Sequence, residues 1–298
     1  MRPGVLVAMA LVLSASDVRA QSEFQVYASV VDGTGAAPAA LQPADITLME
    51  DGVEAKVVKI DTVSFPVKLQ LLLDNGIGIG SDNIQHLRNG VRALLDALPD
   101  GIEVTVVATA PQPRFLVRPT TDRALITKGM ALLSPDGSAG RFVESLNEAT
   151  QRIDKDKGDY APVIISLATI AGDRNVRDSD VAQMSKRLQT RPTTVHVVLV
   201  SLMSGRTLTG GANQTDIGIR VAEMTGGRFE AIVAPTRIAT LLPELGALVA
   251  KAHTSQARQF KITAQRPAGR SGELGNVSMG ARGGLGVVSL SFDGRVRN

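Results

Sequence analysis

Residues 67–98 read VKLQLLLDNGIGIGSDNIQHLRNGVRALLDAL, and this stretch predicts the fold of most of the chain. The first seven residues are almost entirely apolar, which is typical of a strand buried on both faces of a sheet. A glycine-rich loop follows, and Ser81 is a favourable N-cap for a helix. The apolar residues of that helix recur at helical spacing: Ile84, Leu87, Val91, Leu94, Leu95 and Leu98. A strand, a loop and an amphipathic helix in this order predict the first unit of an α/β domain.

The alternation of strands and helices continues as far as residue 252. Further strands are expected at 102–108, 115–117, 163–167 and 195–200, and helices at 122–133, 141–154, 176–189, 215–225 and from Pro235 onward. Several of these strands are wholly apolar, which indicates a mainly parallel sheet covered by helices on both faces. We therefore predict a doubly wound α/β domain over residues 65–252.

Both ends of the chain are predicted to be rich in β-structure. Short strands are expected at 24–31, 46–49, 53–60, 258–264, 276–278 and 286–292. Too few of them lie at either end to make a stable β-sandwich alone. Residues 21–65 carry seven acids and two lysines, whereas residues 251–298 carry eight basic residues and two acids, so charge favours their association. We predict that 21–64 and 253–298 pair into one small β-rich subdomain.

The first 20 residues have the layout of a secretory signal peptide. Arg2 precedes nine apolar residues, and small residues lead to a cleavage site expected after Ala20. Nine residues reach only about 13 Å as a helix, well short of the roughly 30 Å needed to cross the hydrocarbon core of a membrane. We expect a periplasmic or extracellular protein with no integral membrane segment after cleavage.

Composition excludes several classes of chemistry and partner. The chain has no cysteine, so disulfides, thiol catalysis and thiolate metal sites are absent. The net charge of +3 is too small to indicate a nucleic-acid partner. Aromatic residues make up only 3% and tryptophan is absent, which removes the stacking platforms used for single-stranded nucleic acid.

Three stretches of the sequence resemble those of a known family. These are LQPADITLMEDGVEAKV at 41–57, LQLLLDNGIGIGSDNIQHLRNGVRALL at 69–95 and AEMTGGRFEAI at 222–232. They resemble secreted bacterial proteins with a von Willebrand factor type A domain, in particular the subgroup in which a short β segment precedes that domain. The resemblance implies this α/β fold and a role in binding other proteins.

The resemblance also implies where a metal site would lie. Members of the family bind a divalent cation through a D-x-S-x-S motif, a threonine and a second aspartate, which are the oxygen ligands that hard cations prefer. Here the aspartate is Asp74, but the serine positions are Gly76 and Gly78, the threonine position is Gly140, and the second aspartate position is Thr169. We therefore expect a remnant of the site and no bound metal or cofactor.

Two alternatives stay open at this point. The first is a metal-dependent adhesin with a displaced site, because Asp136 lies near Gly140 and Asp173 lies four residues beyond Thr169. The second is an enzyme that uses the glycine-rich loop 76–81 to hold a phosphate or nucleotide at the N-terminus of a helix. That loop has no lysine, and no acid ends the second strand, so neither a P-loop nor a dinucleotide fingerprint is complete.

No pattern of catalytic residues stands out. The three histidines, His86, His196 and His253, have no spacing that would place two of them on one face as metal ligands. The sequence DGSAG at 136–140 lacks the first glycine of a G-x-S-x-G nucleophile turn. We therefore expect that the protein is not an enzyme.

We expect the binding surface at the edge of the sheet where the parallel strands end, here called the carboxyl edge. Ligands of doubly wound folds bind there, and loops on rigid scaffolds often carry function. The expected loops are 74–81, 136–140, 169–175 and 203–215. We predict an interaction module that contacts an unidentified protein partner without a metal. The candidate contact residues are Asp74, Asn75, Asp173, Arg206 and Asn213.

Overall fold

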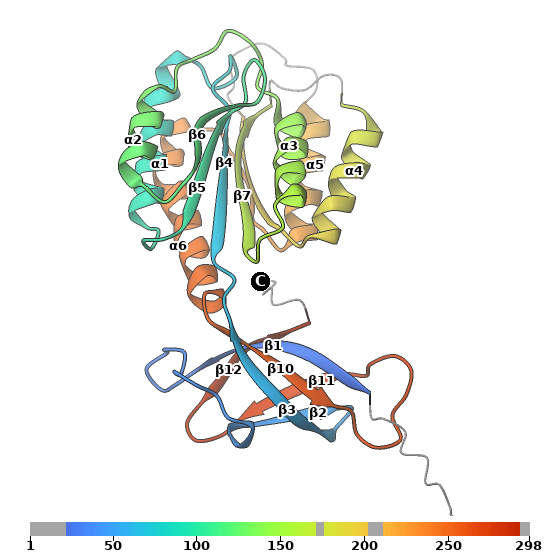
Figure 1. Cartoon of the computed structure of the whole chain (residues 1–298). Coiled ribbons are helices and arrows are strands. Elements are labelled where there is room, and N and C mark those ends of the chain that lie inside the picture. The colour runs from blue at the N-terminus through green and yellow to red at the C-terminus, as the bar shows by residue number, and fades with distance from the viewer. Residues whose placement is uncertain (1–21, 171–175, 202–210, 293–298) are drawn as a thin grey trace, which may run out of the picture.

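The computed structural model describes residues 22–170, 176–201 and 211–292, with only the backbone for 211–213. These residues form an α/β domain and a separate antiparallel sheet (Figure 1). The expected signal peptide lies outside the described residues. Within the described ranges, every helix is too short or too polar to cross a lipid bilayer.

The α/β domain is built on a six-stranded sheet with the order β6-β5-β4-β7-β8-β9. Its strands are β4 (Val67–Leu73), β5 (Glu103–Ala108), β6 (Arg114–Thr120), β7 (Ala161–Thr169), β8 (Thr194–Val200) and β9 (Phe229–Ile232). All neighbours pair in parallel except β6, which is antiparallel to β5. The predicted mainly parallel sheet is confirmed. The strand expected at 115–117 is longer than predicted, because polar residues at both of its ends also pair with β5.

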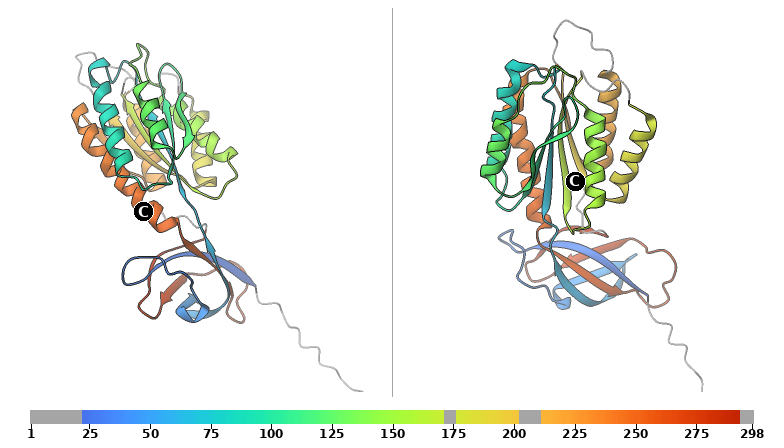
Figure 2. Two further views of the ribbon diagram at one scale, coloured as in Figure 1. Left: turned by 60° about the vertical axis from the view of Figure 1, so that its left-hand side comes forward. Right: turned by 45° about the horizontal axis from the view of Figure 1, so that its top comes forward.

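Helices cover both faces of this sheet (Figures 1 and 2). One face carries α1 (Ile84–Asp96), α2 (Arg123–Ala131) and α6 (Ile238–Gln256), and the other carries α3 (Phe142–Lys155), α4 (Asp178–Thr190) and α5 (Gly211–Thr225). Short 3-10 turns, η2 (Ser81–Asn83) and η3 (Pro235–Arg237), precede α1 and α6. Strand β4 alternates between two cores: Leu71 and Leu73 pack beneath α1 and α6, whereas Leu72 packs beneath α3. The doubly wound architecture follows from this two-sided burial.

The second sheet is antiparallel throughout and has the order β11-β2-β3-β10-β1-β12. Its strands are β1 (Glu23–Val31), β2 (Ile46–Glu50), β3 (Val53–Val63), β10 (Gln259–Gln265), β11 (Val277–Ala281) and β12 (Gly286–Ser291), and a 3-10 turn, η1 (Pro43–Asp45), precedes β2. Four of the five pairings join a strand from the start of the chain to one from its end. A buried ion pair between Glu50 and Arg266 ties β2 to the end of β10.

The α/β domain is inserted between two paired strands of this sheet. Val63 at the end of β3 lies opposite Gln259 at the start of β10. The chain leaves β3 through residues 64–66 into β4, and it returns from α6 through residues 257–258 (Figure 1). The two crossings are joined by a hydrogen bond from the Phe65 amide to the Gln256 carbonyl, with an N···O distance of 3.1 Å.

Two expected boundaries were wrong. Helix α6 continues to Gln256, although helices were expected to stop at residue 252, because Gln256 is buried against the crossing instead of lying in a loop. Helix α5 begins at Gly211, so the expected loop 203–215 ends inside a helix, and Asn213 is helical. Glycine and asparagine are poor helix formers, which is why the sequence favoured a loop at these positions.

Candidate functional site

Asp74 lies directly after β4, in the middle of the carboxyl edge, and its side chain is only 2% exposed. Its Oδ1 accepts a hydrogen bond from the Gly76 amide at 2.7 Å. Its Oδ2 accepts from the Thr169 hydroxyl at 2.6 Å and from the Thr169 amide at 3.1 Å. Burial raises the pKa of the Asp74 carboxyl above its ordinary value, while the hydrogen bonds from Thr169 and Gly76 act in the opposite direction. The protein itself therefore engages both oxygens of this carboxylate.

The backbone at Gly140 packs directly against the same carboxylate. A Cβ atom placed on Gly140 would lie closer than 3.0 Å to Oδ1, Cγ and Oδ2 of Asp74. A Cβ atom on Gly76 would likewise clash with the carbonyl oxygen of Ser138 and with the amide nitrogen of Gly140, at 2.8 Å from the latter. Glycine is needed at both positions because two backbone segments approach closely, and neither has a positive φ.

Asn75 holds this closed arrangement together from beneath. Its side chain is fully buried, and its Nδ2 donates to the Ser134 carbonyl at 2.9 Å. Its Oδ1 accepts from the Ala110 amide at 3.1 Å, and its backbone carbonyl accepts from the Asp136 amide at 2.7 Å. Asn75 therefore joins the loop after β4 to the loop after β5 and to the segment that leads into α3.

The residues at the expected metal position do not fit a divalent cation. Mg²⁺ takes an octahedron of oxygen ligands, and proteins hold it through one or two carboxylates together with bound waters. Here the single carboxylate of Asp74 is engaged, the Thr169 hydroxyl donates its proton to it, and Gly76, Gly78 and Gly140 have no side-chain oxygen. Among the residues that the structure describes, no group of three or more His, Asp or Glu side chains gathers to hold a metal.

The displaced metal site stays a prediction. Asp136 is described, and its Oδ1 accepts a hydrogen bond from the Ser138 amide at 2.8 Å. Its expected companion, Asp173, lies outside the described residues, so the pair is not tested.

The glycine-rich loop 76–81 turns several of its amides inward. The Gly76 amide donates to Asp74, and the Ile77 amide donates to the Ser138 carbonyl at 2.8 Å. The amides of Ile79 and Gly80 both donate to the Gly76 carbonyl, at 3.1 Å and 3.4 Å. A phosphate-binding loop presents such amides to its ligand. The amides of residues 76, 77, 79 and 80 are therefore already engaged within the protein, and the enzyme alternative stays a prediction.

The structure corrects the expected set of contact residues. Asp74 and Asn75 are buried beneath the loops, so their side chains cannot meet a partner at the surface. Asp173 and Arg206 lie outside the described residues, and Asn213 lies in α5 with only its backbone described. These three therefore stay predictions.

Sequence reasoning missed the apolar residues that are exposed around the carboxyl edge. Ile77 is 60% exposed in the loop after β4, and Val233 is 69% exposed directly after β9. Leu132 is 68% exposed at the end of α2. The repeat Gly-Ile-Gly-Ile-Gly gave a hint, but it cannot distinguish exposed Ile77 from Ile79, which is fully buried.

Two of the three histidines have structural roles far from this edge. His196 is buried in β8, its Nδ1 accepts from the Arg228 amide at 3.0 Å, and burial lowers its pKa to about 4. His253, near the end of α6, accepts from the Val67 amide at 3.3 Å. Both imidazoles serve as hydrogen-bond acceptors for backbone amides.

The sheet order, the helices on both faces and an aspartate buried at the end of the central strand define a von Willebrand factor type A fold. The solved structures that are similar to the chain include two of this kind. One is "von Willebrand factor type A from Catenulispora acidiphila", with a TM-score of 0.52, 12% identity, and coverage of 92% of this chain and 74% of the other. The other is the pilus adhesin SpaC from Lactobacillus rhamnosus GG in an open conformation, with a TM-score of 0.52 and 11% identity.

These similarities concern the fold alone. The alignment with SpaC covers 83% of this chain but only 47% of the adhesin. No family model matches the sequence, and no curated protein matches it either.

Proposed function

We propose that this protein is a secreted, non-catalytic interaction module whose carboxyl-edge loops contact a protein partner without a bridging metal. The observation that carries the proposal is the closure around Asp74. Thr169, Gly76 and Gly140 together surround the carboxylate that would otherwise hold a cation. A partner that met this edge would therefore be bound by the loops themselves.

Exposed apolar side chains on these loops supply contacts of a kind that needs no metal. Ile77 stands on a loop that hydrogen bonds fix at Gly76 and at Ser138, so little conformational entropy is lost when it is covered. Burial of an isoleucine side chain is worth about 1.5–3 kcal/mol. Binding through such an anchor is independent of divalent cations, unlike binding through a metal bridge.

The fold and the expected signal peptide support the other parts of the proposal. A pilus adhesin is among the solved structures of similar fold, which favours binding over catalysis as the role of this domain. Secretion rests on the layout of the first 20 residues, and it places the partner in the periplasm or outside the cell.

A site-specific cross-linking experiment tests this function. A photoreactive amino acid replaces Ile77 in the producing organism, and a matched variant carries it at Leu125, which is 52% exposed at the start of α2, near the opposite edge of the sheet. We expect a specific cross-linked protein from position 77, in equal yield with and without excess chelator, and none from position 125. Loss of the product in chelator would refute the metal-free mode, and equal products from both positions would refute the assigned surface.

A further inference from the structure

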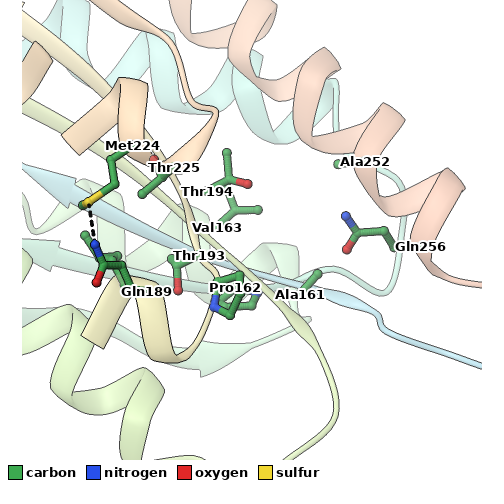
Figure 3. A pocket seen from close by; sticks show the side chains of 12 residues that line it. Ala161, Pro162, Val163, Gln189, Thr193, Thr194, Met224, Thr225, Ala252 and Gln256 are labelled. Atoms are coloured by element: carbon green, nitrogen blue, oxygen red, sulfur yellow. Dashed lines mark hydrogen bonds between the residues drawn. The ribbon is translucent and has the colours of Figure 1, made fainter. Parts of the chain in front are cut away.

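A second candidate site lies at the opposite edge of the α/β sheet, where the parallel strands begin. A cavity of about 140 Å³ opens there between the first residues of β7 and β8 and the last turns of α4, α5 and α6. Figure 3 shows side chains from these elements converging on one hollow. Five separate elements therefore contribute to one cavity far from the carboxyl edge.

The cavity contains a buried hydrogen-bond acceptor that has no partner. Gln256 in the last turn of α6 is only 5% exposed, and it lines the cavity. Its side chain extends from α6 toward the other lining residues (Figure 3). Among the residues that the structure describes, none hydrogen-bonds to its Oε1. An unsatisfied buried acceptor destabilises the fold, so a donor that entered the cavity would recover part of that loss.

The other lining residues define the chemistry of what could enter. None of the twelve carries a charge, and most of the wall is apolar, with Val163, Leu188 and Ala252 among its members. Two hydroxyls in the wall are already used: Thr193 donates to the Arg191 carbonyl at 2.8 Å, and Thr225 donates to the Val221 carbonyl at 2.7 Å. An ion would be desolvated here without a counter-charge, which excludes charged ligands.

The size of the cavity sets the size of the ligand. An apolar cavity of about 150 Å³ is known to bind benzene in another protein. The present cavity differs by the acceptor Gln256 Oε1, to which none of the described residues donates a hydrogen bond. A matching ligand has the volume of a single aromatic ring and one O–H or N–H group.

We propose that this cavity binds a small neutral molecule with an apolar body and one hydrogen-bond donor, which it gives to Gln256 Oε1 when the side-chain amide turns into the cavity. The backbone carbonyl of Gln256 accepts a hydrogen bond from the Phe65 amide at the crossing into the antiparallel sheet. An occupied cavity would therefore also brace the end of α6. This proposal is independent of the proposed function, because the two sites lie at opposite edges of the sheet.

The test uses the full chain with phenol and benzene as probes. Methyl NMR of labelled methionines reports on the cavity through Met224, which lines it, and Met279 in the antiparallel sheet is the internal control. We expect saturable shifts at Met224 and none at Met279. One neutral hydrogen bond should make phenol bind about 2- to 12-fold more tightly than benzene.

Two variants distinguish the role of the Gln256 acceptor in binding from the role of the cavity space. Gln256→Leu replaces the amide by an apolar side chain of similar size and removes the acceptor, so we expect phenol and benzene to bind this variant equally. Ala252→Leu fills the cavity from α6, so neither probe should bind. Circular dichroism checks that both variants fold, and if either does not, a wild-type crystal soaked in phenol must show its oxygen within hydrogen-bonding distance of Gln256 Oε1.

Three results would overturn the proposal. These are the absence of saturable shifts at Met224 in the wild type, an undiminished preference for phenol in folded Gln256→Leu, and a soaked crystal in which ordered water occupies the cavity instead of phenol.

Discussion

Replacement of Gly140 by alanine is the most direct test of the closure around Asp74. The added Cβ would lie closer than 3.0 Å to three atoms of the Asp74 carboxyl group. That group cannot swing aside freely, because hydrogen bonds from Gly76 and Thr169 hold both of its oxygens. Either the backbone at residue 140 or the carboxylate must therefore move.

The expected loss of stability follows from these two routes. Overpacking of a buried site costs about 1–3 kcal/mol. Displacement of the carboxylate weakens a hydrogen bond to a charged group, which is worth about 1.5–3 kcal/mol. Because the structure will take whichever route is cheaper, we expect Gly140→Ala to lower the free energy of unfolding by about 1–3 kcal/mol.

The matched control is Gly137→Ala, three residues earlier in the same segment. A Cβ at Gly137 meets nothing within 4 Å, and its φ is not positive. The change should leave stability unaltered or raise it by about 0.4–1 kcal/mol, because alanine restricts the unfolded chain.

Tyrosine fluorescence in urea measures the α/β domain by itself. The chain has two tyrosines and no tryptophan, so in a Tyr27→Phe background the only tyrosine is Tyr160, which is buried in the α/β domain. Equal unfolding free energies for the alanine variants at 140 and 137 would refute the closure. The segment before α3 would then stand away from Asp74, and a cation site there would have to be reconsidered.

Three further predictions concern buried polar groups. Thr169→Val keeps the shape of the side chain but removes the hydroxyl that donates to Asp74. In urea unfolding it should lower the free energy of unfolding by about 1.5–3 kcal/mol, whereas Thr169→Ser, which keeps the hydroxyl, should lower it less. Burial lowers the pKa of His196 from 6.5 to about 4, so its stabilising contribution is complete above pH 6.5 and is lost as the pH falls toward 4. We expect the free energy of unfolding of the wild type to fall by on the order of 3 kcal/mol over that range. In His196→Asn the fall should be smaller, and an equal fall in both proteins would contradict the assignment of this pH dependence to His196. The Arg266 guanidinium holds the pKa of Glu50 below its ordinary value of 4.5, so the pair stabilises the fold above that pH and loses this effect as the pH falls through the lowered pKa. Arg266→Met should therefore destabilise the chain most at neutral pH. If the difference in unfolding free energy between this variant and the wild type did not become smaller in acid, the result would count against this pairing.

Much of the fold could be predicted because burial on two faces leaves a clear pattern. The apolar runs that became β4, β7 and β8 are central strands of the sheet, and the helices that cover its two faces have apolar stripes. Element ends were predicted less well where tertiary contacts decide them. The last turn of α6 is polar in sequence, and it is helical because Gln256 packs at the crossing between the two sheets.

The position of the candidate site could be predicted from the sequence, but the packing of the protein around Asp74 could not. The sequence alone shows that the expected aspartate is present at Asp74 and that Gly76 and Gly140 have no side-chain oxygen. It does not show that Gly140 packs onto the carboxylate or that Asn75 is buried, because both depend on contacts between segments about 60 residues apart. A charged or amide residue in a loop is usually exposed, and here close backbone approach reverses that expectation.

The place at which the α/β domain enters the antiparallel sheet has a consequence for protein engineering. Val63 and Gln259 face each other in register, so a two-residue Asn-Gly turn could join them directly as a β-hairpin. Residues 64–258 would then be removed as one cassette while every strand of the host sheet kept its neighbours. The same two strand ends could equally receive a different domain, since any insert whose termini lie one strand spacing apart would fit the gap without changing the sheet's register.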